Sequence, residues 1–415
     1  MSPEDSPTTL HPRPRVTAWL KAWQGRNLVK VLTGVRRCGK STALALYAEA
    51  LRADGVPPDR IVRVNYEDPD EPDYPSWRDA WAALKPRLPA GGRTHVLLDE
   101  VQRVPDWERL VDGLHSRGGL DVTVTGSNGS FLSGELATYL TGRYVECRMY
   151  PLSFAEYRAA LAPSVPSPEA VWRRYAREGG FPLALTFGGD TTAVDQYLQG
   201  VLDTILYRDI LERRGFQDAA LLKRLMRFAL DNVGSPLSVN RIVNAFRADG
   251  VRAAASTVDE YLGALCDSYL LCKADRYDIR GKAYLKTLGK YYAVDPGLRF
   301  ALLGTRGADV GHLLENILYL ELRRRYREVY VGWLERGEVD FVTFEEGSPR
   351  YWQVAATVRD PATLRRELAP LRAIHDHCPK TLLVLDPDPD ADFDGIRKLN
   401  ALAFLSGAPC GRSDK

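Results

Sequence analysis

The sequence lacks the patterns that mark membrane, secreted and zinc-binding proteins. No window approaches the roughly 18 uninterrupted apolar residues of a membrane-spanning helix, and the opening segment MSPEDSPTTLHPRPR has no apolar core of a signal peptide. The six cysteines are scattered and form no CxxC pair, which argues against a zinc site or a disulfide framework. We therefore expect a cytoplasmic protein that works in a reducing compartment and has no membrane partner.

An excess of charge of one sign is also missing. The 415 residues include 56 lysines and arginines against 54 aspartates and glutamates, which gives a net charge of +2. This balance excludes neither nucleic acid nor protein as a partner, but the binding surface for either must be a local patch. A chain of this length with 45% hydrophobic residues is long enough for about two to four domains.

A phosphate-binding pattern, GVRRCGKS, occupies residues 34–41. The apolar run before it is typical of a strand, and the alanine- and leucine-rich run after it has helical spacing. A strand-to-helix loop of this kind wraps phosphates with backbone N–H groups, while its lysine reaches the β- and γ-phosphates and its serine binds Mg²⁺. The alternative is a basic turn, which does not need a strand before it and a helix after it. The residues expected to bind ATP and Mg²⁺ here are Gly34, Gly39, Lys40, Ser41 and Thr42.

Two adjacent acids follow an apolar strand in THVLLDEVQ, residues 94–102. Asp99 is expected to hold Mg²⁺, and Glu100 is expected to orient and deprotonate the attacking water. The alternative is a strand that ends in a solvated turn. A further strand, residues 60–66, lies between this segment and the phosphate loop, which favours the additional-strand class of P-loop ATPases over small kinases and GTPases.

The next strand, residues 121–125, ends in GSNGS and places Ser127 and Asn128 at the tip of the sheet. A polar group at that position can sense hydrolysis of the γ-phosphate. A simple turn rich in glycine, asparagine and serine explains the same segment equally well.

The segments GVRRCGKS, VNYED, LLDEVQRVPDWE, VTGSNGSFL, LTGR and YPLSFAEY resemble, in order and spacing, a widespread group of prokaryotic AAA+-type ATPases. The resemblance extends from about residue 13 to about residue 405. It implies ATP binding and hydrolysis on an αβα sandwich, followed by a winged helix and a C-terminal region of nuclease-like fold. Arg36 and Arg37 match the family's usual form of the loop. They either add positive charge near the triphosphate or pair with acidic neighbours.

A proline-rich break at residues 163–168 separates this core from mainly helical sequence. There EGGFP (178–182) and LYRDILERR (206–214) resemble the family's lid region. Arg208, or Arg143 in LTGR, is a candidate arginine finger that contacts the γ-phosphate. The alternative for each is a surface arginine paired with a nearby acid.

Three amphipathic helices from residue 219 onward precede two strand-like runs, 270–278 and 283–294, around a turn at 280–282. This order predicts a winged helix-turn-helix. Basic residues in or beside the wing could contact DNA phosphates. The third helix carries no arginine or lysine, so base reading is poorly supported, and protein docking is the alternative. The basic residues are Arg276, Arg280, Lys282, Lys286 and Lys290.

From about residue 310 the order of elements resembles the αβββαβ core of restriction endonucleases. Glu315 and Asp340 occupy plausible acidic positions, but the E-x-K site of active members reads Gln353-Val354-Ala355. A neutral amide replaces a metal ligand and a methyl group replaces the ammonium. We therefore expect a nuclease-like fold without nuclease activity.

Taken together, these patterns predict an α/β protein that hydrolyses ATP and couples nucleotide state to a partner, either DNA or protein. The alternative is a nucleotide-gated binding switch with little turnover. No pattern specifies an oligomeric state. The expected parts are an N-terminal segment (1–25), a P-loop ATPase core (26–162), a helical lid (163–217), a winged helix-turn-helix (218–305) and a nuclease-like domain (306–415).

Overall fold

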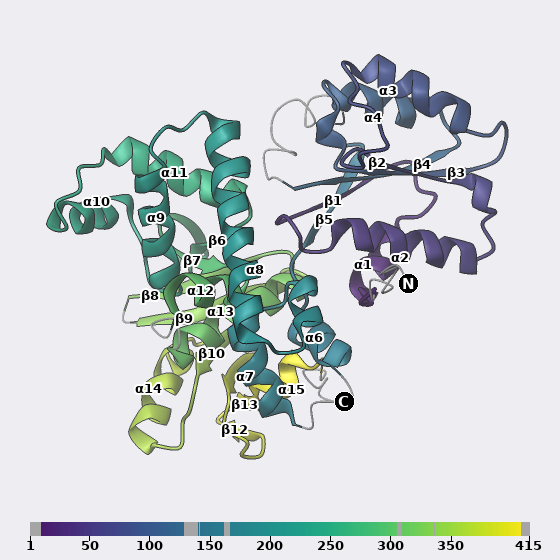
Figure 1. Cartoon of the computed structure of the whole chain (residues 1–415). Helices are drawn as coiled ribbons and strands as arrows, with labels where there is room; N and C mark the ends of the chain where they lie inside the picture. The colour runs from purple at the N-terminus through teal and green to yellow at the C-terminus, as the bar shows by residue number, and fades with distance from the viewer. Residues whose placement is uncertain are drawn as a thin grey trace. The chain divides into compact units, whose positions relative to one another are not determined.

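In the computed structural model, the described residues are 10–127, 140, 142–161, 167–304, 309–335 and 337–407 (Figure 1). The chain divides into two units. The first is Met1–Pro151 together with Asp267–Tyr269, and the second is Leu152–Cys266 together with Leu270–Lys415.

The first unit is built on a parallel five-stranded sheet, as its βα-alternating sequence predicts. The strand order is β2-β3-β4-β1-β5, so β4 lies between the strand that precedes the phosphate loop and the strand that ends in the acid pair. All carboxyl ends therefore meet at one edge. The strands are β1 (Val29–Gly34), β2 (Ile61–Asn65), β3 (Thr94–Asp99), β4 (Leu120–Gly126) and β5 (Tyr144–Met149).

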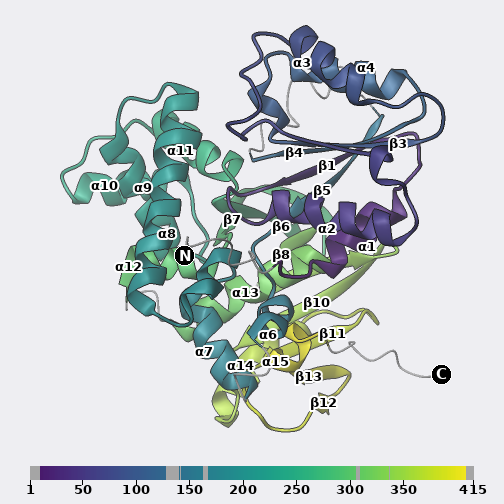
Figure 2. The ribbon, with the colours of Figure 1, turned by 45° about the vertical axis from the view of Figure 1, so that its right-hand side comes forward.

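Helices cover both faces of this sheet. In Figures 1 and 2, α1 (Pro14–Ala22) and α2 (Lys40–Ala53) lie on one face, and α3 (Trp77–Leu84) and α4 (Trp107–Ser116) lie on the other. Because both faces are covered, the three inner strands are buried along almost their whole length, whereas the edge strands β2 and β5 are partly exposed.

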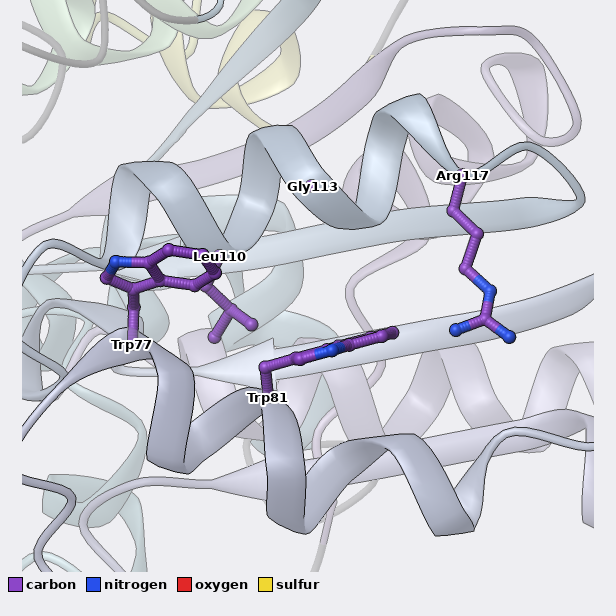
Figure 3. Close-up of a pocket in the computed structure, with 5 residues that line it drawn as sticks. All are labelled: Trp77, Trp81, Leu110, Gly113 and Arg117. Carbon is purple, nitrogen blue, oxygen red and sulfur yellow. The ribbon is translucent and has the colours of Figure 1, made fainter.

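A cavity of about 320 Å³ lies between α3 and α4 (Figure 3). Trp77 and Trp81 of α3 face Leu110 and Arg117 across it, and the guanidinium carbon of Arg117 is 5.3 Å from the centre of the Trp81 ring. This apolar cavity contains none of the residues predicted from sequence to bind phosphate.

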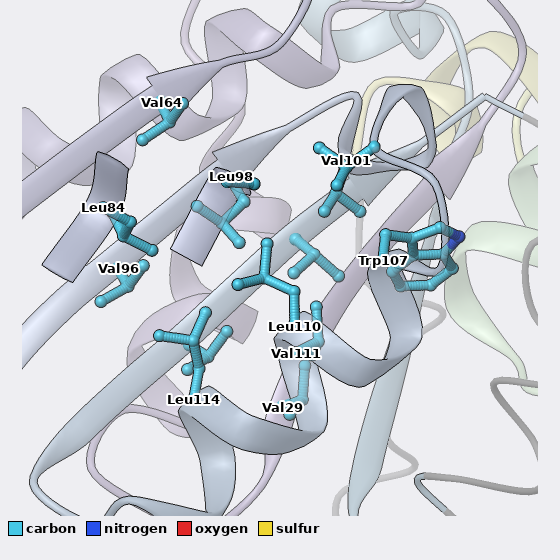
Figure 4. Packing of buried hydrophobic residues seen from close by; sticks show 14 of the residues in the cluster. Val29, Val64, Leu84, Val96, Leu98, Val101, Trp107, Leu110, Val111 and Leu114 are labelled. Atoms are coloured by element: carbon cyan, nitrogen blue, oxygen red, sulfur yellow. The ribbon is translucent and has the colours of Figure 1, made fainter. Parts of the chain in front are cut away.

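The core beneath these two helices is mainly aliphatic, with Trp107 among its aromatic members (Figure 4). Alternate residues of the strands, such as Val29, Val96 and Val122, pack against Leu110 and Leu114 of α4. The alternation leaves the intervening residues of each strand for the opposite face, toward α2.

The second unit begins with helical sequence and continues into a hairpin. The helical elements are α6 (Phe154–Leu161), α7 (Pro168–Glu178), the 3₁₀ helix η5 (Pro182–Phe187), α8 (Thr191–Thr204), the π-helix η6 (Ile205–Glu212), α9 (Ala219–Asp231), α10 (Val239–Ala248) and α11 (Ala255–Asp267). The hairpin consists of β6 (Leu271–Asp278) and β7 (Ala283–Ala293), which pair antiparallel.

This hairpin is the edge of a larger sheet. Strand β6 pairs in parallel with β8, and the eight-stranded order is β12-β13-β11-β10-β9-β8-β6-β7. The predicted wing is thus continuous with the C-terminal sheet. The finer division of this unit into lid, winged helix and nuclease-like domain stays a prediction.

The rest of the second unit follows the predicted order of elements, αβββαβ, from α13 to β11. Among the described residues, no helix has both the length and the apolar character needed to cross a membrane. The elements are α12 (Pro296–Leu303), α13 (Val310–Arg325), β8 (Val329–Leu334), β9 (Gly337–Glu345), β10 (Ser348–Ala355), α14 (Pro361–Arg372), β11 (Lys380–Val384), β12 (Ala391–Phe393), β13 (Ile396–Asn400) and α15 (Ala401–Leu405).

Candidate functional site

The loop between β1 and α2 depends on two glycines. Gly34 has a φ of 145°, and a Cβ atom there would lie 2.3 Å from the carbonyl oxygen of Met149. Gly39, with a φ of 99°, is the N-cap of α2. Only glycine adopts both conformations readily. The two glycines let the loop lead into the N-terminus of the 14-residue helix α2. Lys40, Ser41 and Thr42 form the first turn of that helix.

A buried arginine braces this loop from outside the motif. The guanidinium of Arg13 donates to the carbonyl of Cys38, at 2.9 Å, and to that of Tyr150, at 2.7 Å. Burial raises the pKa of the Cys38 thiol, so the cysteine of the loop is a packed and unreactive side chain. Sequence reasoning missed Arg13, because it stands 25 residues before its first partner.

Lys40 connects the loop to the acid pair at the end of β3. Its buried ammonium donates to the carbonyl of Gly34, at 3.2 Å, and lies 3.4 Å from Glu100 Oε1. Burial raises the pKa of Asp99, although the nearby hydroxyls of Ser41 and Thr125 act in the opposite direction. The structure therefore brings together the four side chains predicted from the two motifs.

Thr125, near the end of β4, is a further site residue. Its hydroxyl donates to Asp99 Oδ1 at 2.5 Å and accepts the backbone N–H of Glu100 at 2.9 Å. One buried side chain therefore fixes both acids. The alternation of DVTVT contained the signal, since Val122 and Val124 pack into the core and the two threonines face the other way.

Glu100 and Gln102 form the outer part of the site. Glu100 has a left-handed φ of 49°, and the 3₁₀ turn η3 (Val101–Arg103) that follows returns Gln102 toward it. Gln102 Nε2 donates to Glu100 Oε2 at 2.5 Å and lies 3.5 Å from Ser127 Oγ. The predicted tip residue Ser127 is thus joined to the acid pair, while Asn128 lies outside the described residues.

Two predicted arginines of the first unit are engaged by acids. Arg36 lies 3.3 Å from Glu67, which also pairs with Arg103. This contact is one of the two roles expected for the loop arginines. Arg37, beside it, has a left-handed φ of 66°. Arg143 is more than half exposed and lies 3.4 Å from Asp112, an arrangement typical of a surface ion pair.

The other candidate finger, Arg208, belongs to the second unit, where it is exposed on the π-helix η6. Helices with this hydrogen-bonding pattern are rare and occur often at functional sites. The role of Arg208 as an arginine finger stays a prediction.

The predicted basic wing is only partly basic at the surface. Lys290 is buried, so its expected contact with DNA phosphates is wrong. Arg280 lies 3.0 Å from Glu335, and Arg276 lies over the Trp333 ring at 5.5 Å. Lys282 is exposed on the turn, and the Lys286 side chain is outside the described part of the chain.

Lys290 instead lies among three carboxylates. Its Nζ is 2.5 Å from Glu338, 3.0 Å from Glu315 and 4.0 Å from Asp340. Burial on its own lowers the pKa of Lys290, but the three acids outweigh burial and raise it, so the ammonium stays charged. Burial and the charge of Glu315 raise the pKa of Asp340. The two acids predicted from the nuclease resemblance therefore lie together, around an ammonium group supplied by the hairpin.

The E-x-K position contributes no charge to this cluster. Gln353 Nε2 donates to Glu367 at 3.0 Å, and the Gln353 amide oxygen is 3.5 Å from the backbone nitrogen of Asp340. Ala355 contributes only a methyl group. Within the part of the chain that the structure describes, no group of His, Cys, Asp and Glu side chains is arranged to hold a metal ion.

The EGGFP segment, which resembles the family's lid, has a packing role in the second unit. A Cβ atom on Gly179 would lie 2.0 Å from Asp295 Oδ1, and the N–H of Gly180 donates to Asp295 Oδ2 at 2.7 Å. Asp295 is also the N-cap of α12. Burial raises its pKa to about 6. Gly179 therefore makes room for a buried cap, and Gly180 donates to it.

Known proteins resemble this chain over most of its length. Residues 26–158 match the model of an AAA domain, and residues 169–309 match a domain of unknown function. An uncharacterised protein of Haemophilus influenzae is 35% identical over 382 residues, which cover 91% of this chain and 94% of that protein. An uncharacterised protein of Methanocaldococcus jannaschii is 27% identical over 333 residues, which cover 77% of this chain and 73% of that protein. A solved structure, the Walker-type ATPase of Pyrococcus abyssi, shares 15% identity with a TM-score of 0.49, covering 70% of this chain and 95% of that one.

Proposed function

Because the chain belongs to the same family as the uncharacterised Haemophilus influenzae protein and carries an AAA domain, we propose that it binds ATP with Mg²⁺ and hydrolyses it. The observation that carries this proposal is the pair of contacts between loop and acid strand. Lys40 lies beside Glu100, and the Ser41 hydroxyl is near enough to Asp99 to favour the charged form of its carboxylate. Two segments nearly 60 residues apart thus form one site at the carboxyl edge of the sheet.

The residues present fit a nucleotide and a hard cation. The glycine-dependent loop and the N-terminus of α2 offer backbone N–H groups to phosphates, and Lys40 supplies a fixed positive charge. Ser41 and Asp99 would hold Mg²⁺, which prefers oxygen ligands. When bound, the ion neutralises charge on the β- and γ-phosphates.

Glu100 is the general base of this proposal. A water oxygen bonds to the γ-phosphorus, the bond from that phosphorus to the oxygen bridging the β-phosphate breaks, and Glu100 accepts a proton from the water. The products are ADP and phosphate. Thr125 keeps Glu100 in place by accepting its backbone N–H.

We propose further that the second unit is the module that engages a partner in response to nucleotide. A protein partner is favoured over duplex DNA, because the hairpin that was predicted to be a basic wing buries Lys290 and pairs Arg280 with Glu335. The alternative is a nucleotide-gated switch that binds ATP and the partner but hydrolyses ATP with little turnover.

Nuclease activity is not part of the proposal. An ammonium lies among Glu315, Glu338 and Asp340, and Gln353 replaces an anionic ligand. Mg²⁺- or Mn²⁺-dependent cutting of DNA that is abolished by Asp340→Ala would contradict this conclusion.

Two substitutions test the ATPase site. Glu100→Gln removes the base and keeps the shape, so ATP turnover should fall about 100- to 10,000-fold while ATP binding is retained. Lys40→Ala should weaken binding itself, because it removes the charge that faces the phosphates. Steady-state phosphate release and equilibrium titration with a fluorescent ATP analogue measure the two effects.

Lys21→Ala is a suitable control, since Lys21 pairs with Asp54 at the surface of the same unit. Wild-type turnover in both Lys40→Ala and Glu100→Gln would show that the site is wrongly assigned. Retained ATP binding without measurable wild-type turnover would instead favour the binding-switch mode.

A further inference from the structure

Gln102 has one amide atom engaged and one atom without a partner. Its Nε2 donates to Glu100, whereas its buried Oε1 has no hydrogen-bond partner among the described residues. We infer that Gln102 positions the attacking water together with Glu100, an inference that rests on the proposed ATPase function. A buried acceptor beside the general base is suited to a water that donates one hydrogen to each of them.

The orientation of the amide follows from its surroundings. A carboxylate oxygen accepts hydrogen bonds and cannot donate them, so the amide group that faces Glu100 Oε2 at 2.5 Å must be the NH₂. The Ser127 hydroxyl, 3.5 Å from the same nitrogen, lies on the same side. The amide oxygen therefore bonds to neither group and is left as an acceptor, next to the nitrogen that holds Glu100.

The backbone also fixes the position of Glu100 beside Gln102. Glu100 turns the chain with a left-handed φ, its N–H is held by Thr125, and the 3₁₀ turn η3 begins at the next residue. Lys40 holds the other carboxylate oxygen at 3.4 Å. Glu100 is thus fixed at both oxygens and at its backbone, so a water bonded to it and to Gln102 would have a defined orientation.

The two side chains divide the chemistry. Glu100 takes the proton released when the water oxygen bonds to the γ-phosphorus, and ADP leaves as the bond to the bridging oxygen breaks. The Gln102 amide keeps its protons throughout, so it is a positioning residue. Ser127 supports the Gln102 amide from the end of β4 and acts one contact further away.

The test compares Gln102→Met with wild type. Methionine has nearly the same length but cannot hold the carboxylate or accept from the water. We expect kcat to fall about 10- to 100-fold while KM and the affinity for the fluorescent ATP analogue change less than about threefold. Ser127→Ala should lower kcat less. Gln196→Met, an exposed glutamine of α8 in the second unit, is the matched control and should leave kcat unchanged.

The variant Gln102→Glu keeps the length of the side chain and an acceptor oxygen but removes the amide that donates to Glu100. We expect its kcat to fall at least tenfold while its affinity for the fluorescent ATP analogue changes less than about threefold, a split that a merely structural loss would not give. Gln102→Asn, which keeps the amide but is shorter, should recover little of the lost rate.

The outcomes separate this inference from the proposed function. If wild type hydrolyses ATP and Gln102→Met has an unchanged kcat, the positioning role is wrong and the ATPase assignment stands. If wild type does not hydrolyse ATP, both the positioning role of Gln102 and the ATPase assignment are wrong. If Gln102→Met fails to fold, the kcat of Gln102→Glu decides, and a kcat equal to that of wild type would overturn the inference.

Discussion

At the scale of single residues, the site depends on one hydroxyl that joins two strands. Thr125 of β4 donates to Asp99 of β3 and accepts from the N–H of Glu100. Both bonds are buried, where a missing partner is costly because no bulk water can replace it. The geometry of the acid pair is therefore set by a side chain on the neighbouring strand.

We predict that Thr125→Val lowers both stability and turnover. Valine has nearly the same shape, but it leaves the Glu100 N–H unpaired and releases Asp99, so unfolding free energy should fall by about 1–3 kcal/mol. Turnover should fall about tenfold or more, because Glu100 is no longer fixed. Urea unfolding and phosphate release measure the two effects.

Thr123→Val is the matched control for this prediction. Thr123 is buried on the same strand and the same face, yet its Oγ1 has no hydrogen-bond partner among the residues that the structure describes. Its substitution should change neither quantity appreciably. Equal effects at both positions would show that the Thr125 hydroxyl has no special role.

The residues of the site differ in how far sequence could predict them. Lys40 and Ser41 belong to a motif whose meaning is local, and Asp99 and Glu100 follow a strand at a suitable distance from it. Arg13, Thr125 and Gln102 carry no such motif. Their roles come from which strands lie side by side and from the left-handed turn at Glu100, neither of which a pattern of residue types specifies.

At the scale of elements, the hairpin β6–β7 shows what periodicity leaves open. Alternation predicted two strands around a turn, and both exist. Alternation does not specify the partner of a strand, and β6 pairs with β8, whose residues lie 55 positions further along the chain. Burial of Lys290 follows from that pairing, because it brings the hairpin beside the acids of α13 and β9.

We predict that Lys290→Met strongly destabilises the second unit at neutral pH. Three carboxylates would lose their only nearby ammonium among the described residues, and breaking a buried ion pair in this way costs about 3–5 kcal/mol. Lys273→Met, which removes a half-buried ammonium paired with Asp275 on β6, should cost less than about 1 kcal/mol.

The pH dependence of Lys290→Met has a definite sign. Without the ammonium, the pKa of Asp340 in the folded state rises further above its unfolded value, so the folded state binds a proton more tightly. Stability is then retained at low pH and lost as pH rises through that folded value. Hydrogen exchange of β9 and β10 at pH 5 and pH 8 would show the difference. Equal protection in wild type and variant at pH 8 would contradict the structural role of Lys290.

At the scale of the whole molecule, the α/β class and the order of elements could be predicted from the sequence, whereas the grouping of the strands into sheets could not. The local hydrophobic periodicity of the sequence indicates the βα alternation of the first unit and the αβββαβ order of the second. The eight-stranded sheet joins strands from two regions expected to be separate domains. The match to a domain of unknown function, residues 169–309, ends before β8, so it includes the hairpin but not the strand that pairs with it.

This grouping bears on how the molecule meets a partner. The overall charge is only +2, and two cations of the hairpin, Arg280 and Lys290, are paired with acids within the second unit. We therefore predict that duplex DNA binds weakly and with a shallow salt dependence, both with and without ATP. Arg280, Lys282 and Lys286 could neutralise at most about three phosphates, which corresponds to a log–log slope of about −2.7. Fluorescence anisotropy of a labelled duplex across a salt series measures this slope. Arg280→Glu combined with Lys282→Glu should remove most of the slope if the hairpin is the contact. A slope steeper than about −5, or one that steepens with ATP, would show that a larger basic surface binds DNA and that the partner is nucleic acid.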